Sequence, residues 1–361
     1  PKGVRVPQRA VINFLESMRH APGLTSASRL AAVTTLSFDI AVLELLLPLA
    51  VGAEIVLVGR EQAGDGLALR ALLEKHHVDT MQATPGTWRL LLESGWRGGP
   101  QFKALCGGEA LPVDLAEALL PRVGELWNMY GPTETTVWST CLRILPGQGD
   151  IVIGRPIANT RVHILDESGA ELPIGAVGEI VIAGAGVTLG YHVRPELTDE
   201  KFIVDPHTPD ARMYRTGDLG RWRSDGQLQH LGRLDQQIKL RGYRIETGEI
   251  ETVLARHPDV AQAVVVAASR GNEDAVLAAY VVPSAGAEVD GQTLRAHLRG
   301  ELPDYMLPTA WIAIDRIPTT PNGKVDRKAL PPIAAPTSAE PARYSQAPST
   351  VSEQRLAEIW R

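Results

Sequence analysis

Short β-branched runs alternate with helical stretches between Arg9 and about Leu120, and this pattern leaves few folds open. Strands and helices in alternation form a sheet of parallel strands with helices packed on its faces. We therefore expect an α/β fold whose large core is a parallel sheet. The periodicity predicts a helix over residues 66–77 and strands over residues 30–36, 54–58, 79–83 and 102–106.

Two changes in the residue pattern divide the rest of the chain into further parts. From about residue 150, short strands separated by Gly, Pro and Asp turns are typical of antiparallel, barrel-like structure. After Ile245, helical and apolar strand patterns predict a small α+β domain, and a Pro-, Ala- and Ser-rich linker follows it. The expected domains are a large core at 1–233 with a barrel-like part at about 145–230, a small C-terminal domain at 234–331, a linker at 332–349 and the start of a further helical domain at 350–361.

Composition excludes several functional classes. The chain carries a net charge of −6 and has a pI near 5.9, whereas nucleic-acid-binding domains are typically basic. No apolar run reaches the ~18 residues that cross a bilayer, and the first residues lack the apolar segment of a signal peptide. The two cysteines are too few for a disulfide framework, which favours a reducing compartment. We expect a cytoplasmic protein that binds neither nucleic acid nor membrane.

Three polar motifs stand out where loops should lie. "YGPTETT" (130–136) follows a short apolar run, and loops at the carboxyl ends of parallel strands bind ligands in α/β sheets. "YRTGDLGRW" (214–222) predicts a turn between strands that carries Asp218. "TTPNGKVDRKALPP" (319–332) sets Lys324 behind a Pro-Asn-Gly turn. Each motif alone is also typical of an ordinary turn, so these residues indicate a site only in combination.

In combination, the motifs resemble the adenylation domain of nonribosomal peptide synthetases, in the family of acyl-adenylate-forming enzymes that includes acyl-CoA synthetases and luciferases. The resemblance covers nearly the whole chain, and the helix that starts near Ser352 is similar to the beginning of a peptidyl carrier domain. Eight motifs follow in the family's order: "PKGV" (1–4), "LSFDIAVLEL" (36–45), "NMYGPTETT" (128–136), "GEIVIAGAGVTLGYHVRPELTDEKF" (178–202), "YRTGDLGRW" (214–222), "GRLDQQIKLRGYRIETGEIE" (232–251), "LPDYMLP" (302–308) and "NGKVDRKAL" (322–330).

The first of these motifs bears on where the sequence begins. "PKGV" resembles the end of the family's Thr/Ser/Gly-rich phosphate loop. The resemblance therefore implies that the glycine-rich part of this loop, and part of the large domain, precede Pro1. We expect the sequence to be an internal piece of a longer chain.

The resemblance implies two ATP-dependent steps. An amino-acid carboxylate attacks the α-phosphate of ATP and releases pyrophosphate, and the aminoacyl group then passes to the phosphopantetheine thiol of a carrier domain. Two anions meet in the first step, so the site needs cations and positioning. The resemblance assigns Lys324 to the substrate carboxylate and the α-phosphate, and Glu134 to Mg²⁺. It assigns Tyr130 to stacking on adenine and Asn128 to the adenine edge. The remaining roles are binding of the ribose hydroxyls by Asp218, of ribose or phosphate by Arg233, and of phosphate by Thr133 and Thr135.

The second step, by the same resemblance, follows a large rotation of the small domain. Asp235 matches the family's hinge position. Gly242 matches a strand that then approaches the site, where a glycine leaves room for the pantetheine arm. Lys324 leaves the site in the same rotation, which suits a mobile turn.

Asp39 matches the family's ligand for the substrate α-amino group. A carboxylate that faces an ammonium group is a strong and specific pair, whereas beside an aryl or fatty acid a buried Asp would be costly. The other pocket positions are mainly large, and volume in a close-packed pocket selects the substrate. They resemble the pocket signature for glycine, with alanine as the alternative. The expected pocket comprises Asp39, Ile40, Leu43, Gln82, Leu105, Gly107, Met129, Val137 and Trp138.

We therefore expect an amino-acid-adenylating ligase of secondary-metabolite or antibiotic biosynthesis. Its expected partners are the amino acid, ATP with Mg²⁺, and the peptidyl carrier and neighbouring condensation domains of the same synthetase. One alternative is a folding or carrier-docking fragment without activity. Another is an acyl-CoA ligase, against which Asp39 and the carrier-like helix argue.

Overall fold

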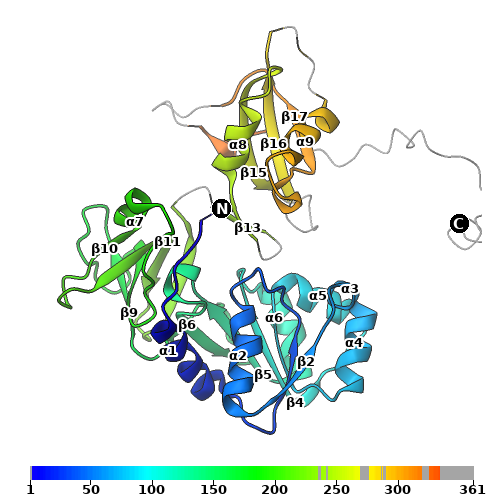
Figure 1. Cartoon of the computed structure of the whole chain (residues 1–361), viewed down its shortest axis with the longest axis vertical. Coiled ribbons are helices and arrows are strands. Elements are labelled where there is room, and N and C mark those ends of the chain that lie inside the picture. Colours follow the sequence, from blue (N-terminus) through cyan, green and yellow to red (C-terminus); the bar gives the residue numbers. More distant parts are fainter. Residues whose placement is uncertain are drawn as a thin grey trace, which may run out of the picture. The chain divides into compact units, whose positions relative to one another are not determined.

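The computed structural model of the chain describes residues 2–234, 237–240, 243–268, 276–285, 287, 290–318 and 325–333. Contacts between residues separate the chain into two compact units, Pro1–Ile245 and Glu246–Arg361 (Figure 1). The expected boundary at residue 234 stays a prediction. Four sequence predictions lie outside the described residues: Asp235, Gly242, Lys324, and the carrier segment 350–361 with nearly all of its linker.

The first unit is built on a seven-stranded sheet. Its strands are β1 (Arg29–Ala32), β2 (Glu54–Leu57), β3 (Thr80–Ala83), β4 (Gly99–Gly107), β5 (Val123–Tyr130), β6 (Thr140–Ile144) and β7 (Arg155–Pro156). They lie in the order β2-β1-β3-β4-β5-β6-β7. The pairs among the first five of that order are parallel, which confirms the predicted core. The β5–β6 and β6–β7 pairs are antiparallel, so the sheet is mixed.

Two of the predicted elements end earlier than their patterns suggest. Strand β1 ends at Ala32, because the Thr34 N–H donates to the Glu44 carboxylate instead of to a neighbouring strand. Helix α4 (Gly66–Lys75) stops two residues short of the expected end, and His77 there adopts a left-handed φ of +50°. Both ends are fixed by local contacts or dihedrals that the periodicity does not show.

Helices cover both faces of the sheet. Alternate residues of a strand point to opposite faces, and in β4 Phe102 and Ala104 belong to one hydrophobic cluster while Leu105 belongs to another. Helices α4, α5 and α6 pack in the first cluster, and α1 and α2 pack in the second. The helices of this part are α1 (Gln8–Met18), a π-helical turn (Arg19–Gly23), α2 (Ala41–Val51), α3 (Arg60–Ala63), α4, α5 (Pro85–Glu93), α6 (Val113–Leu119) and 3-10 turns at Leu120–Arg122 and Thr133–Thr135.

Most of the remainder of the first unit is an antiparallel sheet, as the short strands and frequent turns of residues 145–230 predict. It comprises β8 (Thr160–Leu165), β9 (Gly178–Gly184), β10 (Phe202–Val204), β11 (Arg212–Trp222) and β12 (Leu228–Arg233), with helix α7 (Pro195–Lys201) before β10. Strand β11 is central. Its first half pairs with β10 and its second half with β12, while β9 lies on its other side and pairs with β8.

The predicted turn at Asp218 is wrong, because Asp218 lies inside strand β11. The pairing register shifts between Arg215 and Leu219 on one side of the strand and between Asp218 and Gly220 on the other. Gly217 has a φ of +72° at this point. A β-bulge of this kind turns a side chain without ending the strand.

The second unit is the small α+β domain that the sequence predicts. Strand β15 (Val260–Ala268) pairs antiparallel with β16 (Val276–Pro283), which pairs parallel with β17 (Ala310–Ala313). The further elements of this unit are α8 (Thr247–Leu254), α9 (Gly291–Arg299) and 3-10 turns at Asp304–Met306 and Arg327–Ala329. Strands β13 (Gln237–Leu240) and β14 (Tyr243–Glu246) pair as a separate two-stranded sheet at the end of the first unit, which reaches Ile245. Among the described residues, no helix combines the length and the apolar character needed to cross a membrane.

Candidate active site

The predicted site residues of the first unit gather at the carboxyl ends of the parallel strands. Strand β4 ends at Gly107 and β5 ends at Tyr130, while Asp39 lies in the turn that leads from β1 to α2. Ligands of open α/β sheets bind at this edge. The folding pattern thus brings the motifs around residues 36–45 and 128–136 to one place.

Two adjoining cavities open there. The larger has a volume of about 440 Å³ and is lined by Gly108, Glu109, Ala110, Leu111, Asn128, Met129, Tyr130, Trp138, Ile151, Ile153, Asp218, His230 and Arg233. The smaller has a volume of about 40 Å³ and is lined by Phe38, Asp39, Ile40, Gly108, Gly131, Pro132, Thr133, Trp138, Asp218 and Arg233. Four residues line both, so the cavities meet: Gly108, Trp138, Asp218 and Arg233.

The bulge in β11 directs Asp218 toward the end of β5. The Tyr130 hydroxyl donates to Asp218 Oδ2 at 2.5 Å, and Arg233 Nη1 donates to Asp218 Oδ1 at 2.6 Å. Burial and the neighbouring Asp218 carboxylate raise the pKa of Tyr130 well above its usual range, so the hydroxyl stays protonated as a donor. Three residues that the sequence analysis assigned to one nucleotide site are therefore in direct contact.

Two further predicted nucleotide residues are held by hydrogen bonds within the protein. Asn128 Nδ2 donates to the Val152 carbonyl at 2.9 Å, which fixes its amide at the wall of the larger cavity. Thr135 is 2% exposed, and its hydroxyl lies 2.6 Å from Ser139 Oγ within the loop after β5. Thr135 thus holds the loop together, and its predicted phosphate contact stays a prediction.

His230 lines the larger cavity but was missed by the sequence analysis. Its ring lies 5.8 Å from the Tyr130 ring, and its Nε2 lies 3.4 Å from Asp218 Oδ1. The residue reaches the site because β12 pairs with β11 in a register that sets His230 opposite Gly220. No motif in the sequence indicates that register.

The segment that resembles the end of a phosphate loop lies close to the predicted Mg²⁺ ligand. The His192 N–H donates to the Gly3 carbonyl at 2.6 Å, and the neighbouring Tyr191 hydroxyl donates to Glu134 Oε1 at 2.7 Å. Lys2 Nζ lies 5.9 Å from the centroid of the Tyr191 ring. Glu134 is 1% exposed, and its carboxylate is of the hard-oxygen type that suits Mg²⁺. Tyr191 orients this carboxylate, and it was missed although its motif was matched.

Asp39 is half-buried and faces the loop after β5. It accepts a hydrogen bond from the Thr133 hydroxyl. This contact joins two motifs that lie 94 residues apart in the sequence. Both residues line the smaller cavity, so a carboxylate charge stands at its wall.

The apolar part of the predicted pocket belongs to one buried cluster. Gly107 ends β4 beneath it: a Cβ there would lie 2.6 Å from Trp138 Cη2 and 2.8 Å from the Met129 carbonyl oxygen. Only a glycine lets the indole lie against the strand. Gln82 is fully buried and donates to the Ile40 carbonyl at 2.9 Å, beneath the wall of the cavity. The clustered predicted residues are Ile40, Leu43, Leu105, Met129, Val137 and Trp138.

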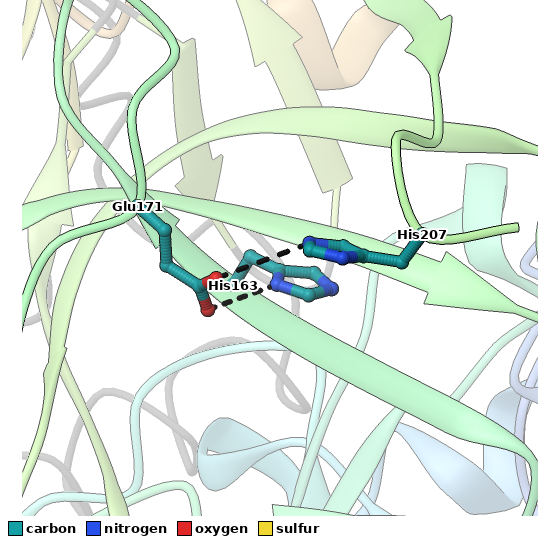
Figure 2. A group of neighbouring side chains, drawn as sticks. All are labelled: His163, Glu171 and His207. Atoms are coloured by element: carbon teal, nitrogen blue, oxygen red, sulfur yellow. Dashed lines mark hydrogen bonds and ion pairs between the residues drawn. The ribbon is translucent and has the colours of Figure 1, made fainter.

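A separate group of potential metal ligands lies on the antiparallel sheet. Figure 2 shows His163 of β8, Glu171 and His207 with ligand atoms within 4.8 Å of one another. His163 Nδ1 lies 3.0 Å from Glu171 Oε1, and the two imidazole rings stack 5.1 Å apart at an angle of 12°. Ligands that share a tetrahedral zinc ion lie about 3.3 Å apart and converge on it. Here the Glu171 carboxylate itself pairs with both rings, since its Oε2 lies 3.9 Å from His207 Nε2. The group is thus an ion-paired cluster outside the predicted site.

Comparison with known proteins agrees with this geometry. The family profile described as "AMP-binding enzyme" matches residues 1–192, and "AMP-binding enzyme C-terminal domain" matches residues 249–324. The chain belongs to the AMP-binding enzyme family. It is an adenylation domain of the nonribosomal peptide synthetase kind, and this family consists of ATP-dependent adenylating enzymes.

Three relatives illustrate the likeness of this adenylation domain. A dimodular nonribosomal peptide synthase of Bacillus subtilis (strain 168) is 47% identical over the whole chain, which spans 15% of that protein. A four-domain nonribosomal peptide synthetase, solved in its holo form with AMP and glycine, is 46% identical with a TM-score of 0.64 over 99% of this chain and 27% of its own. The Vibrio cholerae adenylation domain AlmE, solved with glycyl-adenosine-5′-phosphate, is 25% identical with a TM-score of 0.80 over 90% of this chain and 62% of its own.

Proposed function

We propose that this adenylation domain activates a small amino acid, glycine first and alanine next. ATP supplies the adenylate, and the aminoacyl group passes to the phosphopantetheine thiol of a carrier domain in nonribosomal peptide synthesis. The observation that supports this proposal is the pair of adjoining cavities. A cavity of about 40 Å³ with a carboxylate in its wall opens beside one of about 440 Å³ that holds the Asp218 network.

The smaller cavity selects the amino acid in this proposal. Asp39 binds the α-ammonium group, and its charge-assisted bond fixes the orientation of the substrate. At about 40 Å³ this cavity is far smaller than the adjoining one of about 440 Å³, so little space is left for a side chain. Trp138, lying against Gly107, closes the direction in which a side chain would extend. The two relatives solved with glycine or a glycyl group point to the same substrate.

The larger cavity holds the nucleotide in this proposal. Tyr130 and Asn128 line it at the adenine end, and the Asp218 carboxylate, fixed by Tyr130 and Arg233, accepts hydrogen bonds from the ribose. Glu134 provides the ligand for Mg²⁺, which neutralises charge on the phosphates. The substrate carboxylate then attacks the α-phosphorus, and the bond to pyrophosphate breaks. The residues of the chain act by positioning and electrostatics, without a nucleophile of their own.

The proposal is tested by amino-acid-dependent exchange of labelled pyrophosphate into ATP, with the full-length protein that carries this domain. We expect glycine to give the highest rate, alanine the next, and leucine and phenylalanine only background. An Asp39→Asn variant keeps an acceptor for Thr133 but lacks the charge, and it should lose the exchange while it still binds ATP. A higher rate with leucine or phenylalanine than with glycine would contradict the pocket assignment.

Lys324 and the small domain complete the proposed reaction. Lys324 neutralises the two anions in the first step and is dispensable in the second, when Asp235 serves as the hinge and the strand at Gly242 admits the pantetheine arm. We expect Lys324→Ala to lower adenylate formation by orders of magnitude. Transfer from a supplied aminoacyl-adenylate to the carrier thiol should stay near the wild-type rate. Equal losses in both steps, measured in single turnovers, would overturn this role.

A further inference from the structure

Glu44 is a completely buried carboxylate that the proposed reaction does not use. It lies on α2, one turn after Asp39, and is 0% exposed. Its Oε2 accepts the Thr34 N–H at 2.9 Å, and its Oε1 accepts the Thr34 hydroxyl at 2.5 Å. A buried carboxylate is costly unless its oxygens are hydrogen-bonded. The sequence analysis gave this residue no role, and its burial at the base of the pocket therefore needs an explanation.

The third partner of Glu44 is the pocket residue Gln82. Gln82 Nε2 donates to Glu44 Oε1 at 2.9 Å and to the Ile40 carbonyl at 2.9 Å, so both amide hydrogens face acceptors. A side-chain amide has one donor end and one acceptor end. With its donor end held by two acceptors, Gln82 must direct its oxygen the other way.

The oxygen of Gln82 meets the indole of Trp138. Trp138 Nε1 donates to Gln82 Oε1 at 2.8 Å, and an indole N–H can only donate. If the Gln82 amide were reversed, its NH₂ group would face this N–H and its oxygen would face two acceptors. The orientation of the amide is therefore dictated by Glu44 and the Ile40 carbonyl on one side and by Trp138 on the other.

The backbone just before Trp138 is strained. The two residues before it, Thr136 and Val137, have φ values of +66° and +67°. Non-glycine residues adopt such angles at a cost, and β-branched residues do so especially rarely. Thr136 is anchored through a hydrogen bond from its hydroxyl to the Gly186 carbonyl at 2.7 Å. The hydrogen bond from the Trp138 indole N–H to Gln82 fixes the ring that this strained segment carries.

We infer that Glu44 is a positioning residue that sets the size of the amino-acid cavity by holding Gln82 so that Gln82 fixes the Trp138 ring against Gly107. The inference rests on the proposed function, because it explains how that pocket is kept small. Glu44 itself touches neither the cavity nor the substrate. It acts through two hydrogen bonds in series, one that Gln82 donates to Glu44 and one that Trp138 donates to Gln82.

A Glu44→Gln substitution tests the chain of contacts with almost no change in shape. The new amide cannot accept at both of its ends. If its NH₂ group takes the place of Oε2, it opposes the Thr34 N–H; if it takes the place of Oε1, it opposes the Gln82 NH₂ group. The second orientation is favoured, because the Thr34 hydroxyl beside Oε1 can accept as well as donate, whereas the Thr34 N–H beside Oε2 can only donate. Reversal of Gln82 then removes the acceptor of Trp138. We expect the indole to leave its place and the cavity to widen toward the space of a methyl group.

The first measurement is the ratio of kcat/KM for alanine to that for glycine in pyrophosphate exchange, with the full-length protein. A pocket discriminates one methylene by roughly 10- to 200-fold, so we expect Glu44→Gln to raise this ratio by about tenfold or more. Glu93→Gln, at the exposed end of α5, is the matched control and should leave the ratio unchanged. A ratio within about twofold of the wild type in Glu44→Gln overturns the inference, even if that variant is less stable.

The second measurement does not depend on activity. The indole N–H signal of Trp138 in a ¹⁵N–¹H spectrum, assigned by its loss in Trp138→Phe, should shift in Glu44→Gln and stay in place in Glu93→Gln. An unmoved signal in Glu44→Gln overturns the inference. If none of the amino acids supports pyrophosphate exchange by the wild-type protein, the proposed function fails. The spectrum still decides whether Glu44 positions Trp138.

A double-mutant cycle and a second variant complete the test. If Glu44 acts through the indole N–H, Glu44→Gln should change the alanine-to-glycine ratio far less in a Trp138→Phe background than in the wild type. Equal effects in both backgrounds contradict the inference. Should Glu44→Gln fail to fold, Gln82→Met, which keeps the side-chain length but offers no amide oxygen, should reproduce the raised ratio. An unchanged ratio in Gln82→Met overturns the inference as well.

Discussion

Gly107 shows how the absence of one side chain allows a pocket to pack. Because a Cβ there would come within 2.6 Å of the Trp138 ring and 2.8 Å of a backbone oxygen, Gly107→Ala should lower the free energy of unfolding by about 1–3 kcal/mol. Urea denaturation followed by tryptophan emission measures this loss. Gly99 begins the same strand and has open space around it. Gly99→Ala is therefore the matched control, and equal stability of the two variants would contradict the packing argument.

Glu44 also predicts how stability depends on pH. Burial raises the pKa of this carboxyl above its ordinary value of 4.5. In the unfolded chain the group ionises near that value, whereas in the folded chain it resists ionisation. As the pH rises above about 4.5, the unfolded state is therefore favoured by this group. Urea denaturation across this range should show the wild type losing stability relative to Glu44→Gln. A difference that is constant with pH, or that grows in favour of the wild type, contradicts the assignment.

Residues in motifs could be predicted from the sequence, and residues that join motifs could not. Asp39, Gly107 and Trp138 were predicted because their motifs resemble those of the family; in the structure Asp39 and Trp138 line the smaller cavity, and Gly107 lies against Trp138. Glu44 only interrupts an apolar helix in the sequence. Its partner Gln82 lies 38 residues away on another element. The physical role of such a residue is a set of distances between elements, and local patterns contain none of these.

Helix α4 presents a local device that can be tested without reference to the site. Asp65 precedes the helix, and its Oδ1 accepts the N–H groups of Leu67 at 2.8 Å and Ala68 at 3.1 Å. These are orphan donors of the first turn, so Asp65→Ala should destabilise the first unit by about 1 kcal/mol. Asp65→Asn keeps the acceptor oxygen and is expected to stay within a few tenths of a kcal/mol of the wild type. Chemical denaturation decides between the two, and equal losses would show that charge rather than capping matters.

Strands were predicted best where the hydrophobic pattern of the sequence agrees with the strand pairing in the sheet. Strands were predicted over residues 79–83 and 102–106, and the structure has β3 at Thr80–Ala83 and β4 at Gly99–Gly107, where they pair with each other in parallel. The segment 214–222 misled because a glycine beside an Asp is typical of a turn and also of a bulge. Which of the two forms depends on the neighbouring strands. Here β9 and β12 pair with both sides of β11 and keep it extended through Asp218.

The whole molecule consists of two units, each with its own hydrophobic core. The clusters of the first unit lie on both faces of the seven-stranded sheet and in the antiparallel sheet. The second unit has a cluster around Ala278, Tyr280 and Ala310. Cores of this kind allow units of one chain to unfold as separate cooperative transitions. Lys324, which we propose acts in the first step of the reaction, belongs to the second unit in sequence.

Two glycines allow this division to be tested. Gly291 begins α9, and a Cβ there would lie 2.8 Å from Trp311 Cδ1 and 2.9 Å from Trp311 Cγ in the ring that belongs to β17. Gly291→Ala should therefore lower the unfolding temperature of the second unit by several degrees, whereas Gly107→Ala should lower that of the first. Differential scanning calorimetry of the full chain measures both transitions. If either substitution moves the two transitions together, the units unfold as one cooperative body, and the stability of the pocket at Gly107 then depends on the small domain.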